Sequence, residues 1–237
     1  MRNEAIREQK TGPVEVAVAD VAVVLDPSGV AFLPDSRVLV VSDLHLEKGA
    51  AFARKRQFLP PYDTRETLAR LAVSIASYDP ELVISLGDSF HRDDSAAGLD
   101  AGDRQALESL IHGRDWIWIA GNHDPSLPAQ LPGHAAFELA CGGLVFRHEP
   151  SAGRNAGEVA GHLHPGARIV MRGRSVRRPC FAADGTRLIM PSFGSYTGSL
   201  NVLDPAFRGL FDPSRLSACM LGSGRIYPVP SRRLRPD

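Results

Sequence analysis

The 237-residue sequence predicts an α/β fold in which two sheets face each other and helices lie on the outside. In the first half, strand-like runs alternate with helical patterns, an order that is typical of parallel strand pairing. In the second half, helical patterns become rare and short strand-like runs follow one another through turns, which favours a more antiparallel sheet. The simplest assembly packs the two sheets face to face.

Short apolar runs, several of them rich in Val, predict the strands of the first half. They span residues 14–19, 21–25, 38–41, 82–86 and 116–120. A first helix is expected to begin at Asp63, because Asp63 as N-cap and Glu66 three residues later form a capping-box pattern. Apolar side chains then follow at helical spacing, at Leu68, Leu71, Ala72 and Ile75. A second helix is expected over residues 103–112, with Gly113 ending it.

The strands of the second half are predicted over residues 143–147, 167–171, 180–183 and 187–190. The dipeptide Asp184-Gly185 between the last two is a strong hairpin signal. The sequence shows no repeat, no low-complexity block and no long linker, so residues 13–230 are expected to form a single domain. A flexible N-terminal arm (1–12) and a basic C-terminal tail (231–237) would flank it, and we expect the tail to be disordered.

Charge and cysteine content narrow the class of protein. Lys plus Arg and Asp plus Glu are equal at 27 each, which excludes a uniformly basic nucleic-acid coat, so a polyanion must be held by a local patch or by metal. Three cysteines without a CxxC spacing argue against a disulfide framework and for a reducing compartment. The N-terminal residues lack an apolar core, and no apolar stretch is long enough to span a bilayer. These features predict a cytoplasmic protein without membrane association.

Acidic, amide and imidazole side chains follow the predicted strands where these end. Because the carboxyl ends of strands in an α/β sheet border one crevice, side chains that follow three such strands are expected to converge. A strand of the second half ends at His148, and the sequence Gly-His-Leu-His supplies two further imidazoles. The candidate ligands are Asp43, His45, Asp88, Asn122, His148, His162 and His164.

These seven side chains suit a pair of divalent ions. If Asp88 is shared, each ion has about four protein ligands, and mixed oxygen and nitrogen donors without thiolate favour Mn, Fe, Co, Ni or Zn over Ca or Mg. Two dications with two carboxylates leave a positive site, which attracts a phosphate ester and stabilises a bridging hydroxide as nucleophile. His123 beside Asn122 is placed to serve the leaving group, and Asp124 is expected to orient its imidazole.

Each of these residues on its own has an ordinary structural interpretation as a turn, a cap or a loop histidine. The ordered set D-x-H, G-D, G-N-H-D, H and G-H-x-H is far more specific, and with it the sequence resembles the calcineurin-like metallophosphoesterase family. The resemblance implies a four-layer α/β/β/α sandwich of two facing mixed sheets. It assigns two ligand sets, one of Asp43, His45, Asp88 and His164 and one of Asp88, Asn122, His148 and His162. It also implies that His123 assists the leaving group.

The resemblance implies two divalent transition-metal ions, with Mn(2+) as the first expectation and Fe or Zn as alternatives. The chain departs from the usual family motif at one position, where His91 stands in place of an Asp three residues after the bridging aspartate. We expect the metal ligands to be unaffected, and His91 either contacts substrate or supports the local structure.

Segments between and around the motifs resemble one subfamily, the ligase-associated DNA damage response endonucleases. Among them are DLHLEKG, LPPYDT, GDSFH, FRHEP, GHLHP and VRRPCF. This resemblance implies a DNA endonuclease linked to DNA repair, with a ligase, a helicase or a nuclease as possible protein partners. The rival hypotheses are a small-nucleotide phosphodiesterase or phosphatase and a non-catalytic scaffold of the same fold. The complete ligand set argues against the scaffold.

Contacts to DNA are less specific in the sequence. Arg54, Arg56, Arg177 and Arg178 either bind phosphates or are solvated loop charges paired with nearby acids. Phe193 and Tyr196 lie in a Gly-Ser-rich segment, where base stacking, core packing and an oligomer contact are all open. Edge strands of the second half could pair across an oligomer, although no feature requires one.

Overall fold

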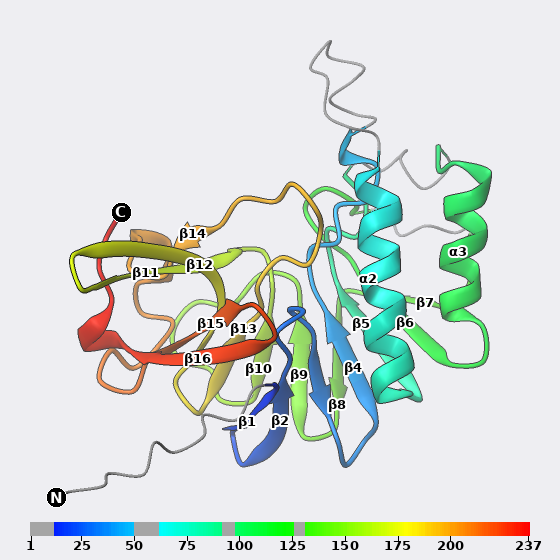
Figure 1. The fold of residues 1–237 in the computed structure, drawn as a ribbon. Helices are drawn as coiled ribbons and strands as arrows, with labels where there is room; N and C mark the ends of the chain where they lie inside the picture. Colours follow the sequence, from blue (N-terminus) through cyan, green and yellow to red (C-terminus); the bar gives the residue numbers. More distant parts are fainter. Residues whose placement is uncertain (1–11, 50–61, 92–97, 126–130) are drawn as a thin grey trace, which may run out of the picture.

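Two β-sheets pack face to face in the computed structural model, and helices cover the outer face of the first sheet (Figure 1). The structure describes residues 12–49, 62–91, 98–125 and 131–237. The predicted sandwich of two facing mixed sheets is confirmed. The predicted N-terminal arm lies almost wholly outside the described residues.

The first sheet contains seven strands in chain order, four of them parallel neighbours. The first three strand pairs are antiparallel, so the sheet is mixed. The third and the seventh strand, which have three residues each, were not predicted from the sequence. The other five lie at or near their predicted positions. The strands are β1 (Val14–Val18), β2 (Val21–Leu25), β3 (Ala31–Leu33), β4 (Val38–Val41), β5 (Leu82–Leu86), β6 (Asp115–Ile119) and β7 (His134–Ala136).

The helices α2 (Asp63–Tyr78) and α3 (Ala101–Ile111) lie side by side on this sheet. The predicted capping box of α2 is wrong. Tyr62 is the N-cap, and the Asp63 carboxylate accepts a hydrogen bond from the backbone of Gly49 at 2.9 Å instead. Helix α3 begins two residues earlier than expected, because the side chain of Asp100 caps it by accepting from the Gly102 N–H at 2.8 Å.

The second sheet has nine strands and is also mixed. Strand β10, which was not predicted, pairs in parallel with both of its neighbours, and most other pairs are antiparallel. The turn at Asp184-Gly185 joins β12 to β13 as predicted. The strands are β8 (Glu138–Cys141), β9 (Leu144–Arg147), β10 (Glu158–Ala160), β11 (Pro165–Met171), β12 (Arg174–Ala183), β13 (Arg187–Ile189), β14 (Leu200–Asn201), β15 (Ser217–Gly222) and β16 (Arg225–Pro230).

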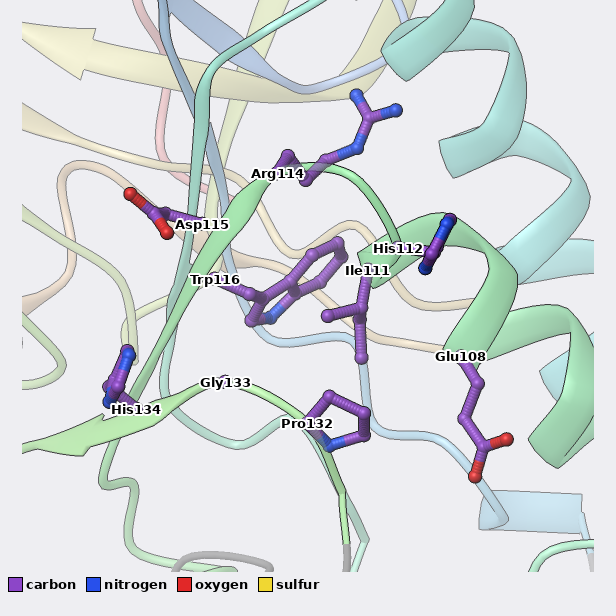
Figure 2. Close-up of a pocket in the computed structure, with 9 residues that line it drawn as sticks. All are labelled: Glu108, Ile111, His112, Arg114, Asp115, Trp116, Pro132, Gly133 and His134. Carbon is purple, nitrogen blue, oxygen red and sulfur yellow. The ribbon is translucent and has the colours of Figure 1, made fainter.

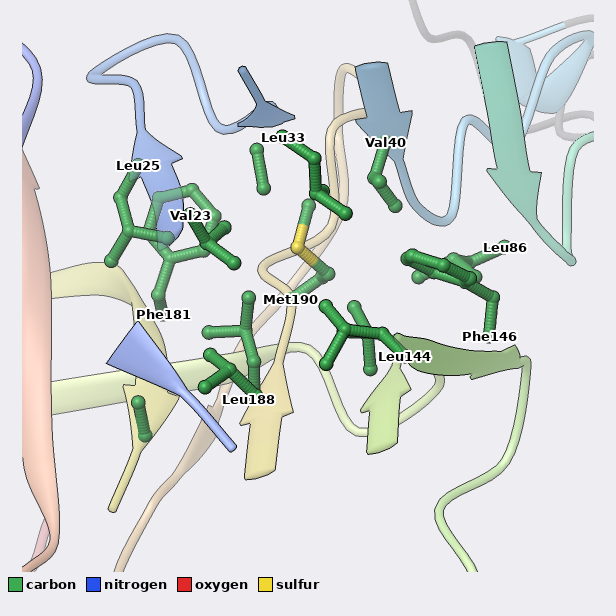
Figure 3. Close-up of a cluster of buried hydrophobic side chains, with 14 of the residues drawn as sticks. Val23, Leu25, Leu33, Val40, Leu86, Leu144, Phe146, Phe181, Leu188 and Met190 are labelled. Atoms are coloured by element: carbon green, nitrogen blue, oxygen red, sulfur yellow. The ribbon is translucent and has the colours of Figure 1, made fainter. Parts of the chain in front are cut away.

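The main core fills the space between the two sheets (Figure 3). Val40 and Leu86 of the first sheet face three side chains on the side of the second sheet. Phe146 and Phe181 belong to its strands, and Met190 directly follows β13. Strand β4 is buried on both faces, because alternate residues point to the sheet interface and to the helices. This double burial fixes the carboxyl end of β4, where the first candidate ligands follow.

The outer face of the second sheet is covered by the connection between β14 and β15, residues 202–216, and by the C-terminal residues. This connection includes the short 3-10 helix Pro205–Phe207. The expected disorder of the tail is wrong. A second 3-10 helix spans Ser231–Arg233, Leu234 is buried, and the Arg235 N–H donates to the carbonyl of Arg168 at 2.8 Å. The three cysteines are free thiols, and no helix among the described residues could cross a membrane.

Candidate metal centre

The candidate ligands lie at the carboxyl ends of β4 and β5 and in the turns that follow β6, β9 and β10. Five of the seven have left-handed backbone conformations, with φ between 43° and 66°. Such conformations cost on the order of 1–3 kcal/mol each for residues with a β-carbon and occur mainly where function requires them. The five residues are Asp43, His45, Asp88, His162 and His164.

The first group of ligands consists of Asp43, His45 and His164, which offer donor atoms within 4.8 Å of one another. The Nε2 atoms of the two imidazoles are 3.3 Å apart, and Nε2 of His164 is 3.1 Å from Oδ1 of Asp43. Asp43 is fully buried. Its Oδ2 accepts hydrogen bonds from the Ser42 hydroxyl and the His162 N–H, whereas Oδ1 is buried and forms no hydrogen bond with any described residue.

The second group consists of Asp88, His148 and His162. Nε2 of His148 is 3.2 Å from Nδ1 of His162 and 3.5 Å from Oδ1 of Asp88. The other ring nitrogen of His148, Nδ1, lies 2.8 Å from the carbonyl of Leu86 and must donate to it. This hydrogen bond leaves the lone pair of Nε2 directed at the other ligands, as is usual for a metal-binding histidine.

Asp88 connects the two groups. Burial lowers the pKa of His45 in the first group and of His162 in the second, and the negative charge of Asp88 opposes that lowering in both rings. The same charge adds to the raised pKa of His164. Asp43 in turn is 4.0 Å from Nδ1 of His148. The two groups of candidate ligands therefore lie next to each other, with Asp88 at their boundary.

Burial sets the protonation of two of the imidazoles. It lowers the pKa of His45 to about 4 and also lowers the pKa of His162, so both rings are neutral at pH 7. Burial alone would raise the pKa of Asp43, but the imidazole of His164, whose Nε2 is 3.1 Å from Oδ1, outweighs it and lowers the pKa. Neutral imidazole and ionised carboxylate are the forms that bind metal.

The donor set fits two transition-metal ions. Two ligand nitrogens that each lie about 2.1 Å from one ion are separated by roughly 3.0–3.4 Å, and both imidazole pairs have such separations. Oδ1 of Asp43 is buried without a hydrogen-bond donor, so it is available to bind a metal ion. The mixture of imidazole and carboxylate ligands also suits transition metals.

His123 lies in the turn after β6, exposed beside this centre, and Asn122 directly precedes it. Its backbone N–H donates to Oδ1 of Asp88 at 2.8 Å, and its Nδ1 is 3.2 Å from the carbonyl of His91. The ring of His91 stacks on that of His123, with centroids 5.4 Å apart and planes inclined by 19°. His123 is therefore oriented by the His91 backbone, a partner that the sequence pattern does not specify.

The role expected for Asp124 is wrong. Its carboxylate is buried and accepts hydrogen bonds from the N–H groups of Gly121, Ser89 and Phe90, and the structure shows no contact with the imidazole of His123. Burial raises the pKa of Asp124 to about 6. Asp124 instead joins the turn that carries His123 to the loop that follows Asp88.

The arginines expected to bind substrate behave differently from one another. Arg54 and Arg56 lie outside the described residues. The guanidinium of Arg177 pairs with Asp237 at 2.9 Å and donates to Ser199 at 2.7 Å. These contacts favour the second of its two interpretations, a charge paired with a nearby acid, over a phosphate contact. Arg178 is exposed and lies opposite Ala167 in the β11–β12 pair.

The close packing around the ligands requires two glycines that the sequence analysis named only as parts of motifs. A β-carbon at Gly161 would collide with the Ser42 hydroxyl and lie 2.7 Å from Oδ2 of Asp43. A β-carbon at Gly121 would collide with the backbone nitrogen of Asp88 and lie 2.6 Å from Oδ1 of Asp124. Ser42, whose hydroxyl donates to Asp43, was not identified as a site residue from the sequence. Its position directly before a candidate ligand could have indicated this role.

A cavity of about 330 Å³ lies at the opposite end of the first sheet, where β6 and β7 begin (Figure 2). Ile111, Trp116 and Pro132 form its apolar wall, whereas Arg114 and Asp115 point away from the indole of Trp116. Polar groups do not converge there, so the ligand clusters at the carboxyl ends of the strands remain the candidate site.

The fold combines two facing mixed sheets with two clusters of carboxylate and histidine at one edge. This combination defines a metallophosphoesterase. The model of the calcineurin-like phosphoesterases matches residues 36–183, and the chain belongs to this family. That range includes every candidate ligand. No curated protein sequence matches the chain.

Among solved structures, the chain is similar to the nuclease MPE of Pseudomonas putida, with a TM-score of 0.71 and 28% identity over 92% of this chain and 100% of that one. It also matches YfcE, a phosphoesterase from E. coli, with a TM-score of 0.40 and 15% identity over 81% of this chain and 98% of that one. A predicted phosphoesterase from Streptococcus pneumoniae matches with a TM-score of 0.32 and 15% identity, over 84% and 97% of the two chains.

Proposed function

We propose that this phosphoesterase is a two-metal-dependent phosphodiesterase that cleaves DNA as an endonuclease linked to DNA repair. The observation that carries the proposal is the pair of ligand clusters joined at Asp88 with His123 exposed beside them. The similarity to the nuclease MPE and the resemblance of the motif-flanking segments to the ligase-associated DNA damage response endonuclease PdeM support DNA as substrate. Protein partners from DNA repair and a cytoplasmic location belong to the same proposal.

Each residue has a defined task in this proposal. Asp43, His45 and His164 would hold one ion, Asn122, His148 and His162 the other, and Asp88 both, with Mn(2+) as the first expectation. When bound, the ions supply positive charge to the phosphate and lower the pKa of a water molecule. The imidazole of His123, held at Nδ1 by the His91 carbonyl, gives a proton from its other nitrogen to the leaving oxygen. Stacking on His91 limits the rotation of that ring.

The β11–β12 hairpin supplies a surface suited to a polynucleotide. Residues 165–183 contain five arginines and no acidic residue, in a protein without net charge, and the hairpin begins directly after the ligand His164. Arg172, Arg174 and Arg178 are exposed and form no ion pair within the described part of the chain. A row of cations that leads away from the centre favours a long phosphate backbone over a mononucleotide.

The test is a cleavage assay on circular and end-labelled DNA with added manganese, with His123→Ala beside the wild-type protein. An aryl phosphodiester serves as the positive control. Cleavage of circular DNA that is lost in His123→Ala supports the endonuclease. Turnover of the aryl diester with intact DNA would contradict it and favour a small-nucleotide substrate. Absence of metal and of all turnover would favour a non-catalytic scaffold.

A further inference from the structure

The connection between β13 and β14 (Figure 1, gold to orange) contains an aromatic residue that is partly exposed to solvent. Tyr196 is 44% exposed, and its side chain forms no hydrogen bond and no ring stacking with any other described residue. The other aromatic residue of this connection, Phe193, is 1% exposed and packs under the Arg70 guanidinium, whose carbon is 4.4 Å from the ring centroid. Of the two aromatic residues singled out in the sequence, one therefore belongs to the core and one does not.

Both sides of Tyr196 are fixed to the residues that form the centre. On one side, the Gly194 N–H donates to the carbonyl of Asp43 at 3.0 Å, and on the other the Leu200 N–H donates to the carbonyl of His164 at 2.9 Å. Gly194 is two residues from Tyr196, so the two Cα atoms are within about 7 Å of each other. Tyr196 therefore lies in a short segment whose two ends are hydrogen-bonded to the backbones of two candidate ligands of the first group.

The residues adjacent to Tyr196 hold its backbone in place. The Ser195 N–H donates to the Thr67 hydroxyl of α2 at 3.1 Å, and the Thr197 hydroxyl donates to the Gly194 carbonyl at 2.8 Å. Tyr196 itself has φ of 59°, in the left-handed region that favours glycine. A bulky residue in this conformation, with its ring partly open to solvent, indicates that the side chain is used rather than buried.

We propose that Tyr196 is a substrate-positioning residue whose ring stacks on the nucleobase next to the scissile phosphodiester. This inference rests on the proposed function and extends it, because it assigns base recognition to a residue outside the metal ligands and the leaving-group histidine. Aromatic rings stack on every base without sequence preference, and the bases of single-stranded DNA are free to receive them. The hydrogen bonds of Ser195 and Thr197 already hold the backbone of Tyr196 in place. The loop therefore needs little further ordering when the base binds.

The experiment compares two substrates that have the same leaving group and differ only in the presence of a nucleoside. These are the p-nitrophenyl phosphodiester of thymidine and methyl p-nitrophenyl phosphate, each assayed with manganese. The wild-type protein is expected to prefer the thymidine ester. Tyr196→Leu is expected to lower the ratio of kcat/KM for the two esters about tenfold, mainly through KM, and Tyr196→Phe to restore it. Tyr227→Leu, at an exposed tyrosine on β16, is the matched control and keeps the ratio.

Tyr196→Gly separates substrate binding from folding. Glycine suits the left-handed backbone, so this variant is expected to unfold at the same temperature as the wild type or a higher one while it loses the preference for the base. A wild-type preference that survives in Tyr196→Leu would overturn the proposal and leave the proposed function intact. A wild-type protein without any preference for the thymidine ester would count against both. A dimer that dissociates in Tyr196→Leu, measured by sedimentation, would overturn the proposal and assign the ring to an oligomer contact instead.

Discussion

The backbone N–H of His123 donates a hydrogen bond of 2.8 Å to Oδ1 of Asp88, the carboxylate that lies between the two groups of ligands. The same oxygen is 3.5 Å from Nε2 of His148. Because the contact to His123 is made by the main chain, the position of its turn depends on Asp88, whereas the Asp88 carboxylate does not depend on the imidazole. Substitutions at the two positions should therefore have different effects.

His123→Ala should lower kcat for phosphodiester hydrolysis by a factor on the order of 10²–10⁴, because the leaving oxygen loses its proton donor. The main-chain hydrogen bond to Asp88 is retained in alanine, so metal content should stay normal. Steady-state kinetics and elemental analysis of the same preparation measure both effects. His134→Ala, at an exposed histidine on β7, is the control. Loss of metal in His123→Ala would show that the ring is a ligand.

Asp88→Ala should remove metal and activity together, since both groups of ligands lose the carboxylate at their boundary. Elemental analysis should find substantially less metal per chain after dialysis than in the wild type. Asp103→Asn, at a buried aspartate of α3 that pairs with Arg65 rather than with a candidate ligand, should keep the wild-type content. Wild-type metal content and full turnover in Asp88→Ala would exclude a binuclear centre shared at this residue.

Much of the centre could be predicted from sequence because each ligand belongs to a short motif directly after an apolar run. Strand β4 and its following Asp43 and His45 are an example, since strand, turn and ligands lie within a few residues. The left-handed backbone of these residues gave no sequence signal. Glycine often adopts this conformation, whereas here Asp and His adopt it. Backbone hydrogen bonds to residues distant in the sequence stabilise it.

Several contacts that could not be predicted from the sequence are made by side chains whose partners are distant along the chain. Asp63 accepts from Gly49 rather than capping its own helix, and Arg177 pairs with Asp237, far along the chain. Asp124 accepts from Ser89 and Phe90 on the neighbouring strand's loop. Local patterns describe such polar residues correctly as hydrogen-bonding groups but cannot identify the partner.

Gly121→Ala should disrupt the centre without changing any ligand. The added β-carbon would meet the backbone nitrogen of Asp88, which cannot move aside as a flexible side chain would. We expect weaker metal binding, a lower unfolding temperature and reduced turnover, measured by metal titration, thermal melting and kinetics. Gly198→Ala is the control, because a β-carbon at Gly198 meets no described atom within 4 Å. Equal metal affinity in Gly121→Ala and the wild type would contradict the tight approach of the two turns.

The β11–β12 hairpin should contribute to DNA binding in a salt-dependent manner. Each phosphate that a variant no longer binds should reduce the slope of log affinity against log salt by about one. Arg174→Ala combined with Arg178→Ala, in a His123→Ala background that prevents cleavage, is expected to show this change by fluorescence anisotropy with single-stranded DNA. Arg225→Ala on β16 is the control. An unchanged slope in the double variant would place the DNA elsewhere.

Asp184→Asn should destabilise the second sheet more at neutral pH than in acid. Oδ1 of Asp184 accepts from Thr186 and Arg187, and Oδ2 accepts from the Asp212 N–H at 2.9 Å. Burial alone would raise the pKa of Asp184, but these hydrogen bonds outweigh it and lower the pKa below the ordinary 3.8. Asparagine presents an NH₂ group to one of these donors, so the free energy of unfolding at pH 7 should fall by about 1–3 kcal/mol.

The pH dependence follows from the direction of that shift. A lowered pKa in the folded state stabilises the protein above the ordinary pKa of aspartate, and this stabilisation is lost as the pH falls through the folded-state value. The difference in unfolding free energy between the wild type and Asp184→Asn should therefore narrow below about pH 4. Urea unfolding of metal-free protein at several pH values measures it, with Asp35→Asn at an exposed turn as control. A difference that stays constant down to about pH 2 would mean that the carboxylate charge is not what stabilises this turn.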